Sequence, residues 1–129
     1  MNCHSMIGKE SAALAPLREA WETGKPVQWV RVNDLPDYSY FNHSMHIRAN
    51  VGCESCHGNI SEMEVVKRAE PLSMGWCLDC HRDPAKHIRP ANMITKFNWK
   101  ATEESIQAAQ KFMKEKGIRP SEDCSTCHR

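Results

Sequence analysis

The sequence predicts a single, mainly α-helical domain with much irregular structure and few short strands. Three observations support this class of fold. The chain has 129 residues, an ordinary length for one domain. Aromatic residues make up only 7% of it, so a core built from its own side chains would be thin. It also contains seven cysteines and seven histidines, clustered mainly among turn-forming residues, which leaves little room for regular structure.

The first predicted element is a helix over residues 16–23. Apolar side chains recur at helical spacing through residues 9–23, but Pro16 cannot donate a backbone hydrogen bond, so the helix should begin near it. Gly24 is expected to end the helix. Apolar and polar residues then alternate over residues 27–32, which predicts a short strand or an extended segment.

The second predicted helix covers residues 102–116. Thr102 can cap its first turn, and the two glutamates that follow suit the positive end of the helix dipole. Ile106, Ala109 and Met113 fall on one face, as expected of a helix that packs on a core. The intervening chain is rich in turn formers, so we expect irregular structure there, with single helical turns.

The most informative pattern is Cys-x-x-Cys-His, which occurs at residues 53–57, 77–81 and 124–128. This is the attachment pattern of c-type haem. Two thiols on one helical turn can each bond one porphyrin, which holds the adjacent histidine beneath the iron. We therefore predict three haem c groups, with a haem core over residues 41–90 and a last motif at 124–128. The expected thioether cysteines are Cys53, Cys56, Cys77, Cys80, Cys124 and Cys127, and the expected proximal iron ligands are His57, His81 and His128.

Other kinds of chemistry use the same residue types. Cysteine pairs and histidines also bind zinc, and Cys-x-x-Cys pairs form disulfides or thioredoxin-like redox sites. None of these explains a histidine directly after the second cysteine of each motif, so we favour haem over a zinc-stabilised interaction module. A multihaem reductase stays an alternative, because it would need only one iron without a sixth protein ligand and basic residues around it.

Three histidines outside the motifs are candidates for the distal iron ligand. His43 and His46 lie on one short segment before the first motif, where their imidazoles could reach two different irons. His87 lies in ordinary surface sequence, which suits either a ligand or a solvent-exposed side chain. If it is not a ligand, one haem could use methionine, although most methionines serve packing. The methionines available for this are Met74, Met93 and Met113.

Cys3 and His4 look like the end of a fourth Cys-x-x-Cys-His motif. We expect an incomplete haem site here, with one thioether from Cys3 and an iron ligand from His4. The alternative is an unpaired cysteine near a flexible terminus. Since c-type haem is attached outside the bacterial inner membrane, we expect an export signal upstream and infer that Met1 is not the true beginning.

The charge of the chain favours no charged polymer as a partner. Lysine and arginine number 17 against 16 acidic residues, so the formal charge of +1 gives no reason to propose nucleic acid. No run approaches the roughly 18 apolar residues of a membrane-spanning helix. Four arginines near the motifs could pair with haem propionates or simply be solvated. These are Arg48, Arg82, Arg89 and Arg129.

Several segments together resemble the pentahaem cytochrome subunit of bacterial alternative complex III, a quinol:cytochrome c oxidoreductase. The resemblance is detailed from Met1 to Pro90, and the last motif fits the final haem of that family. Compared with it, this sequence lacks the membrane anchor, the first haem motif and half of the second. The segments that carry the resemblance are Met-Asn-Cys-His (1–4), Gly-Lys-Pro-Val-Gln-Trp-Val-Arg-Val (24–32), Asp-Leu-Pro (34–36), Phe-Asn-His (41–43) and Pro-Leu-Ser-Met-Gly-Trp-Cys (71–77).

This resemblance implies an electron-transfer subunit, not an enzyme in its own right. It implies a place on the periplasmic side of the inner membrane, with membrane association through the missing N-terminal region or through partners. Electrons would come from menaquinol through an iron–sulfur partner and pass to a cytochrome c or a terminal oxidase. The Phe-x-His-x-x-His segment is also similar to cytochrome c7, and this likeness implies that His43 serves the haem of His57.

Overall fold

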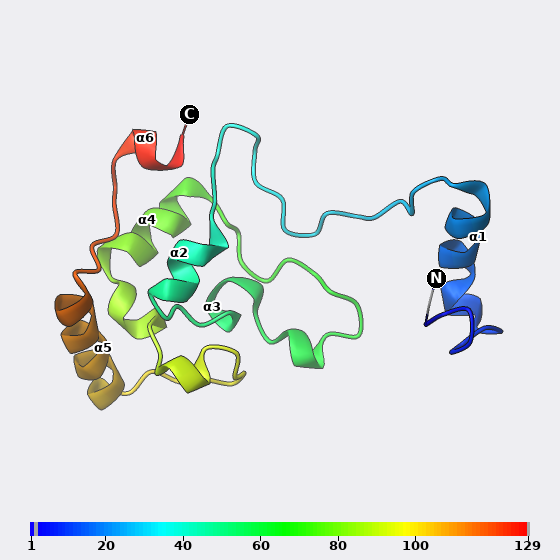
Figure 1. Cartoon of the computed structure of the whole chain (residues 1–129). Helices are drawn as coiled ribbons and strands as arrows, with labels where there is room; N and C mark the ends of the chain where they lie inside the picture. Colours follow the sequence, from blue (N-terminus) through cyan, green and yellow to red (C-terminus); the bar gives the residue numbers. More distant parts are fainter. Residues whose placement is uncertain (2, 129) are drawn as a thin grey trace. The chain divides into compact units, whose positions relative to one another are not determined.

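The computed structural model describes residues 1 and 3–128, which fall into two compact units, Met1–Arg31 and Val32–Arg129 (Figure 1). The expectation of one domain therefore stays a prediction, and each unit is described by itself. Within the described residues the secondary structure is helical, and β structure is limited to two isolated bridges, Ser39 with His128 and Val51 with Ile88. The predicted class, mainly helical with much irregular structure, is confirmed, and its few short strands are reduced to these bridges.

The first unit contains a 3-10 turn, η1 (Ala12–Leu14), followed by α1 (Ala15–Thr23). Pro16 lies in the first turn of α1, where no backbone amide hydrogen is needed. The helix ends at Gly24, whose φ of 68° is left-handed and suits glycine. Residues 24–31 have no regular secondary structure, so the strand considered for residues 27–32 does not form. A strand needs a neighbouring strand with which to pair, and the bridges among the described residues lie elsewhere, at Ser39 and Val51.

The second unit is built from short helices joined by loops. Three of them, α3, α4 and α6, each carry one Cys-x-x-Cys-His motif, and Figure 1 shows α2 close to α3 and α4. The single turns at the first and last motifs agree with the short turns predicted there. At the second motif the structure differs, because α4 spans nine residues, as many as α1. The elements are α2 (His43–Arg48), α3 (Glu54–His57), η2 (Ile60–Glu62), α4 (Met74–Arg82), η3 (Pro84–His87), η4 (Ala91–Met93), α5 (Glu103–Lys116) and α6 (Cys124–Cys127).

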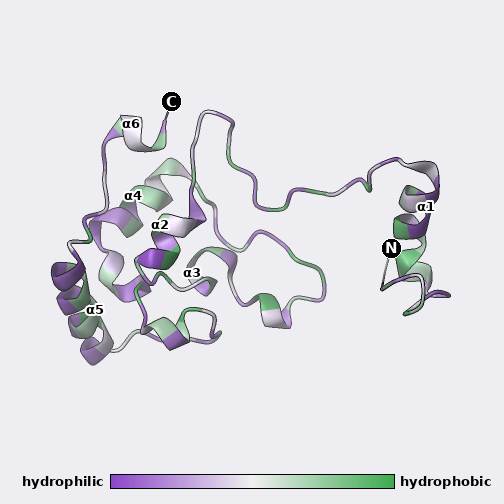
Figure 2. Cartoon of the chain, viewed as in Figure 1, coloured by the Kyte–Doolittle hydropathy of each residue, from purple (hydrophilic) through white to green (hydrophobic). Residues whose placement is uncertain are grey.

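Helix α5 corresponds to the helix predicted over residues 102–116. The Thr102 hydroxyl accepts a hydrogen bond from the Ser105 amide at 3.2 Å, and the Ser105 hydroxyl accepts one from the Thr102 amide at 2.9 Å. These two bonds satisfy amides that have no partner inside the helix. Gly117 ends α5 in the left-handed region with φ 63°. Hydrophilic and hydrophobic residues segregate along α5 in Figure 2, and Ala109 supplies its buried contact.

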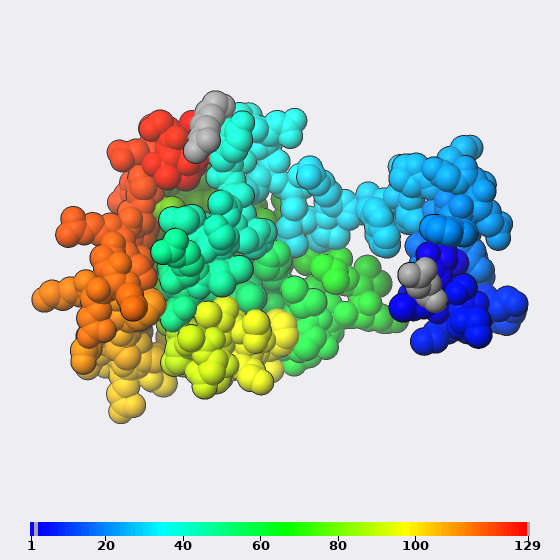
Figure 3. All heavy atoms as spheres, viewed as in Figure 1, coloured from blue at the N-terminus to red at the C-terminus, as the bar shows by residue number. Residues whose placement is uncertain are grey.

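The protein core of the second unit is small. Its buried hydrophobic residues are Ala85, Ile88 and Ala109, and among the described residues no large side chain is fully buried. Phe41 and Met45, which lie beside and within α2, remain 44% and 61% exposed, and the space-filling view shows the α2 segment at the surface of its unit (Figure 3). Exposed apolar side chains gathered on one segment are typical of a site that binds an apolar partner.

No helix among the described residues has the length and hydrophobicity needed to cross a membrane.

Candidate haem-binding site

The three Cys-x-x-Cys-His motifs lie next to one another. Burial and, after it, the nearby thiols of Cys80 and Cys77 together raise the pKa of Cys56 to about 11. Burial also raises the pKa of Cys77, with Cys127 of the last motif as its charged neighbour. The first motif therefore borders the second, and the second borders the last.

The cysteines do not have the environment of a zinc or redox site. All seven are free of disulfides. The described residues contain no group of three or more histidine, cysteine or carboxylate side chains positioned to hold a metal ion. The arrangement does not support the zinc-stabilised module.

Two distal candidates lie opposite two motif histidines. The rings of His43 and His57 are 6.2 Å apart between centroids and nearly parallel, at 8°. The rings of His46 and His81 are also 6.2 Å apart, at 40°. A metal–imidazole bond is about 2 Å long and the ring centre lies about 1 Å beyond the nitrogen, so two imidazoles on one iron are about 6 Å apart. Both pairs therefore fit a haem iron with two histidine ligands.

Hydrogen bonds orient several of these imidazoles. Nδ1 of His81 lies 2.6 Å from the Ser121 carbonyl oxygen, and Nδ1 of His128 lies 3.2 Å from that of Tyr38. Nδ1 of His46 lies 3.1 Å from the carbonyl oxygen of Asn42. An Nδ1–H that donates to a carbonyl fixes the tautomer in which Nε2 carries the lone pair, and metal-binding histidines show this arrangement. In this tautomer the three rings keep Nε2 free to bind a metal.

His46 is also held in its neutral form. Burial lowers its pKa in spite of the hydrogen bond to Asn42, and the neighbouring His81 and His43 lower it further. A protonated imidazole has no lone pair for iron. The site therefore favours the form of His46 that can bind a metal.

His57 has a side-chain partner in place of a carbonyl. Asn33 Nδ2 lies 3.3 Å from His57 Nδ1, while Asn33 Oδ1 is buried without a hydrogen-bond partner. Half a turn of the amide exchanges these two atoms and lets Oδ1 accept from Nδ1–H. The side-chain oxygen of Asn33 then accepts from Nδ1–H of His57 and fixes its tautomer, as backbone carbonyl oxygens do for His81 and His128.

A buried ion pair fastens the first motif to the loop before α5. Arg89 is only 4% exposed, and one of its terminal nitrogens lies 3.1 Å from the carboxylate of Glu54. Its other terminal nitrogen donates to the Lys96 carbonyl at 2.7 Å, and the guanidinium lies over the Trp99 ring. Gly52 makes this packing possible, because a Cβ there would overlap the guanidinium. Arg89 therefore braces the fold and is not left free for a propionate.

The same contacts favour the ionised form of the Glu54 carboxylate. Burial alone would raise its pKa, but hydrogen bonds from the backbone amides of Asn98 and Trp99 and the charge of Arg89 lower the pKa below its ordinary value. The amide nitrogens lie 2.8 and 3.1 Å from its carboxylate oxygens. Because Glu54 is the second residue of the first motif, these bonds position the helical turn that carries Cys56 and His57.

The other arginines that could pair with haem propionates have different surroundings from Arg89. Arg82 is exposed and pairs with Glu122 at 2.9 Å and with Asp79 at 3.8 Å. Arg48 is exposed at the end of α2. Arg129 lies outside the described residues.

His87 is not brought to a motif histidine. It ends η3, and its side chain lines a cavity of about 340 Å³ together with Ser55, Glu70 and Trp99. Burial lowers the pKa of His87, and the charge of Lys86 acts in the same direction. Of the alternative methionines, Met113 packs against the core of Ala85, Ile88 and Ala109.

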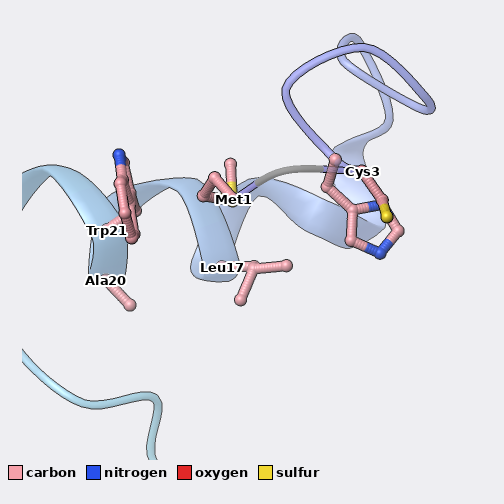
Figure 4. A pocket seen from close by; sticks show the side chains of 6 residues that line it. Met1, Cys3, Leu17, Ala20 and Trp21 are labelled. Atoms are coloured by element: carbon pink, nitrogen blue, oxygen red, sulfur yellow. The ribbon is translucent and has the colours of Figure 1, made fainter.

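The first unit presents a separate apolar hollow at Cys3 and His4. Figure 4 shows Met1 and Leu17 between Cys3 on one side and Ala20 and Trp21 on the other, and these residues line the hollow together with His4. His4 Nδ1 lies 3.3 Å from the Ile7 carbonyl oxygen, the arrangement seen at His81 and His128. The local geometry is compatible with the predicted incomplete haem site, which stays a prediction.

Three haem-attachment motifs, paired imidazoles and uncovered apolar surface define this chain as a multihaem c-type cytochrome. The family described as cytochrome c7 and related cytochrome c matches residues 39–129. The chain belongs to that family, whose members carry covalently bound haem c and transfer electrons through it. A comparison with curated proteins finds no match.

Sequence reasoning missed the residues that support the imidazoles. Asn33 is 24 positions from His57, and the Ser121 carbonyl is 40 positions from His81. Nothing local in the sequence marks such partners. The sequence suggests for Arg89 only a propionate partner or solvent, because its burial against Gly52 depends on the tertiary fold.

Proposed function

We propose that residues 41–128 hold three haem c groups and pass electrons between them as part of a membrane-associated quinol:cytochrome c or oxidase complex. The haem assignment rests on two pairs of opposed imidazoles. These are His43 with His57 and His46 with His81, and the ring centroids of each pair are 6.2 Å apart. Helix α2 supplies one ring to each pair. One short helix thereby links two neighbouring sites.

The roles of the protein residues follow from this arrangement. The cysteine pairs of α3, α4 and α6 form the thioethers, and His57, His81 and His128 are the proximal ligands. When bound, the haem supplies one-electron redox chemistry. The chain fixes ligand orientation through Nδ1 hydrogen bonds, and such hydrogen bonding around the ligands tunes reduction potential.

The first test replaces each distal candidate in the haem-loaded protein. His43→Ala and His46→Ala should each convert one low-spin haem to high-spin without releasing it, because the thioethers and the proximal histidine remain. Electron paramagnetic resonance and absorption spectra of the purified variants measure this. Unchanged spectra in both variants would refute the ligand assignment.

The membrane context follows from the sequence resemblance to the alternative complex III subunit. We propose partners that include an iron–sulfur protein, a cytochrome c or terminal oxidase as acceptor, and a position on the periplasmic side of the inner membrane. Affinity purification of the tagged protein from solubilised membranes of its native host tests this. Recovery with an iron–sulfur subunit supports the complex, and recovery of the chain alone from the periplasmic fraction contradicts it.

A further inference from the structure

The three motif histidines of the second unit have two kinds of partner at Nδ1. His81 and His128 lie against backbone carbonyl oxygens, which any residue at those positions would supply. His57 instead lies against the side chain of Asn33, 3.3 Å away. The support of His57 therefore depends on which amino acid stands at position 33.

Iron binding at His57 fixes how the Asn33 amide must point. An imidazole that binds a metal through Nε2 carries its proton on Nδ1 and needs an acceptor there. The amide nitrogen Nδ2 is a donor, so it cannot be the partner of an Nδ1–H. The amide oxygen Oδ1 is an acceptor, and it is buried without a hydrogen-bond partner. The unpaired acceptor of Asn33 thus matches the need of the adjacent imidazole.

Arg68 holds the backbone on both sides of Asn33. A terminal nitrogen of its guanidinium donates to the Asp34 carbonyl at 3.1 Å, and its Nε donates to the Val32 carbonyl at 3.4 Å. A guanidinium donates in a rigid planar fork, so the two bonds together fix the carbonyl groups that flank Asn33. The backbone that carries Asn33 is therefore held independently of the contact with His57.

The loop that carries Arg68 begins at the first motif itself. Gly58 follows His57 directly and has a φ of 66°. It approaches Ala69 so closely that a Cβ at Gly58 would lie 2.6 Å from the Cβ of Ala69. The loop thus returns to its starting point one residue after Arg68. It brings the residue that holds the Asn33 segment back to the motif that Asn33 supports.

We propose that Asn33 is a positioning residue that sets the reduction potential of the haem bound at His57, and that Arg68 holds Asn33 in place for this role. The inference rests on the proposed function. An acceptor for Nδ1–H raises the basicity of the imidazole, and hydrogen bonding of this kind around a ligand tunes the potential. Among the three motifs, the first is then the site whose potential one side chain can change.

Two substitutions of Asn33 in the haem-loaded protein should move one midpoint potential in opposite directions. Asn33→Asp offers Nδ1–H a carboxylate, which is a stronger acceptor and adds negative charge, so the potential should fall. Asn33→Leu is branched in the same way but has no acceptor, so the potential should rise. Spectroelectrochemistry measures the three midpoint potentials, and the other two should move less.

His43→Ala identifies the haem that responds. The ring of His43 faces that of His57, so this variant should make the same haem high-spin. In the His43→Ala background, Asn33→Asp should therefore shift the potential of the high-spin haem. In the His46→Ala background it should shift a low-spin haem, because His46 faces His81.

Arg68→Lys tests the second part of the proposal without a change of charge. Lysine lacks the planar fork that holds both flanking carbonyls, so the variant should raise the same midpoint potential that Asn33→Leu raises. It should add no further shift to a protein that already carries Asn33→Leu. Arg119→Lys, at an exposed position of the same unit, is the matched control and should leave all three potentials unchanged.

Shifts in the same direction in Asn33→Asp and Asn33→Leu would overturn the inference, because they would show a general effect on folding. Unchanged potentials in both variants, or a shift at a haem other than the one that His43→Ala marks, would also overturn it. If neither Asn33 variant is matured, Arg68→Lys decides, and unchanged potentials there would count against the proposal. Failure of the unmodified chain to carry covalent haem would instead overturn the proposed function itself.

Discussion

At the scale of single residues, the account depends on groups that hold the imidazoles and the first motif in place. Three motif histidines have a fixed Nδ1 partner, and the first motif is also tied down by the pair of Glu54 and Arg89. The cysteines and proximal histidines could be identified from the sequence because their spacing is local. Asn33 and Arg89 could not, because their roles depend on residues that are distant in the chain.

Replacing Glu54 by glutamine should destabilise the protein by about 2–3 kcal/mol, because it leaves the buried guanidinium of Arg89 without its counter-charge. Urea unfolding followed by circular dichroism measures the loss. Glu122→Gln is the matched control: its pair with Arg82 is about half exposed on both sides, so the cost should stay below about 1 kcal/mol. Equal losses in the two variants would contradict the bracing role of Arg89.

The same variant has a signature in its pH dependence. The pKa of Glu54 is lowered in the folded state from its ordinary value of 4.5, so its contribution to stability is complete above that value. The contribution is lost as the pH falls through the lower, folded-state pKa. The stability difference between the unmodified protein and Glu54→Gln should therefore shrink below pH 4.5. A difference that grows on acidification would show that Glu54 is not ionised in the fold.

At the scale of elements, local sequence signals predicted α1 and α5 well, but not α4, which is as long as α1. Helix α1 begins with a proline in its first turn and ends at a glycine. Helix α5 begins after Thr102 and ends at Gly117. The short helices at the motifs followed from the attachment geometry. The β-prone run at residues 27–32 gave no strand, because strand formation depends on a partner and not on local preference.

Thr102→Ala should cost about 1 kcal/mol, because the amide of Ser105 loses its acceptor at the start of α5. Urea unfolding measures the change. Lys111→Ala on the same helix is the control, since its side chain is 79% exposed and its contact with Glu115 is 3.9 Å long, so its effect should stay within about 0.5 kcal/mol. A Thr102→Ala cost no larger than that of Lys111→Ala would show that the capping box does not stabilise the fold.

At the scale of the whole molecule, covalently bound haem explains why so little of the protein's own material is buried. Ala85, Ile88 and Ala109 cannot support nearly a hundred residues as a core, and large apolar side chains near α2 remain uncovered. The thin core was predictable from composition. The opposition of His43 and His46 to different motif histidines was predictable only in outline, because the spacing shows that two irons are in reach without showing which.

The most direct test of the account is the intact mass of the chain, exported in a host that matures c-type cytochromes and recorded with its absorption spectrum. We predict a mass gain of three haems, with the low-spin absorption of bis-histidine sites dominating the spectrum. A fourth haem would show attachment at Cys3. An unmodified mass from a folded, exported chain would contradict the account, because the three motifs would then bind no haem.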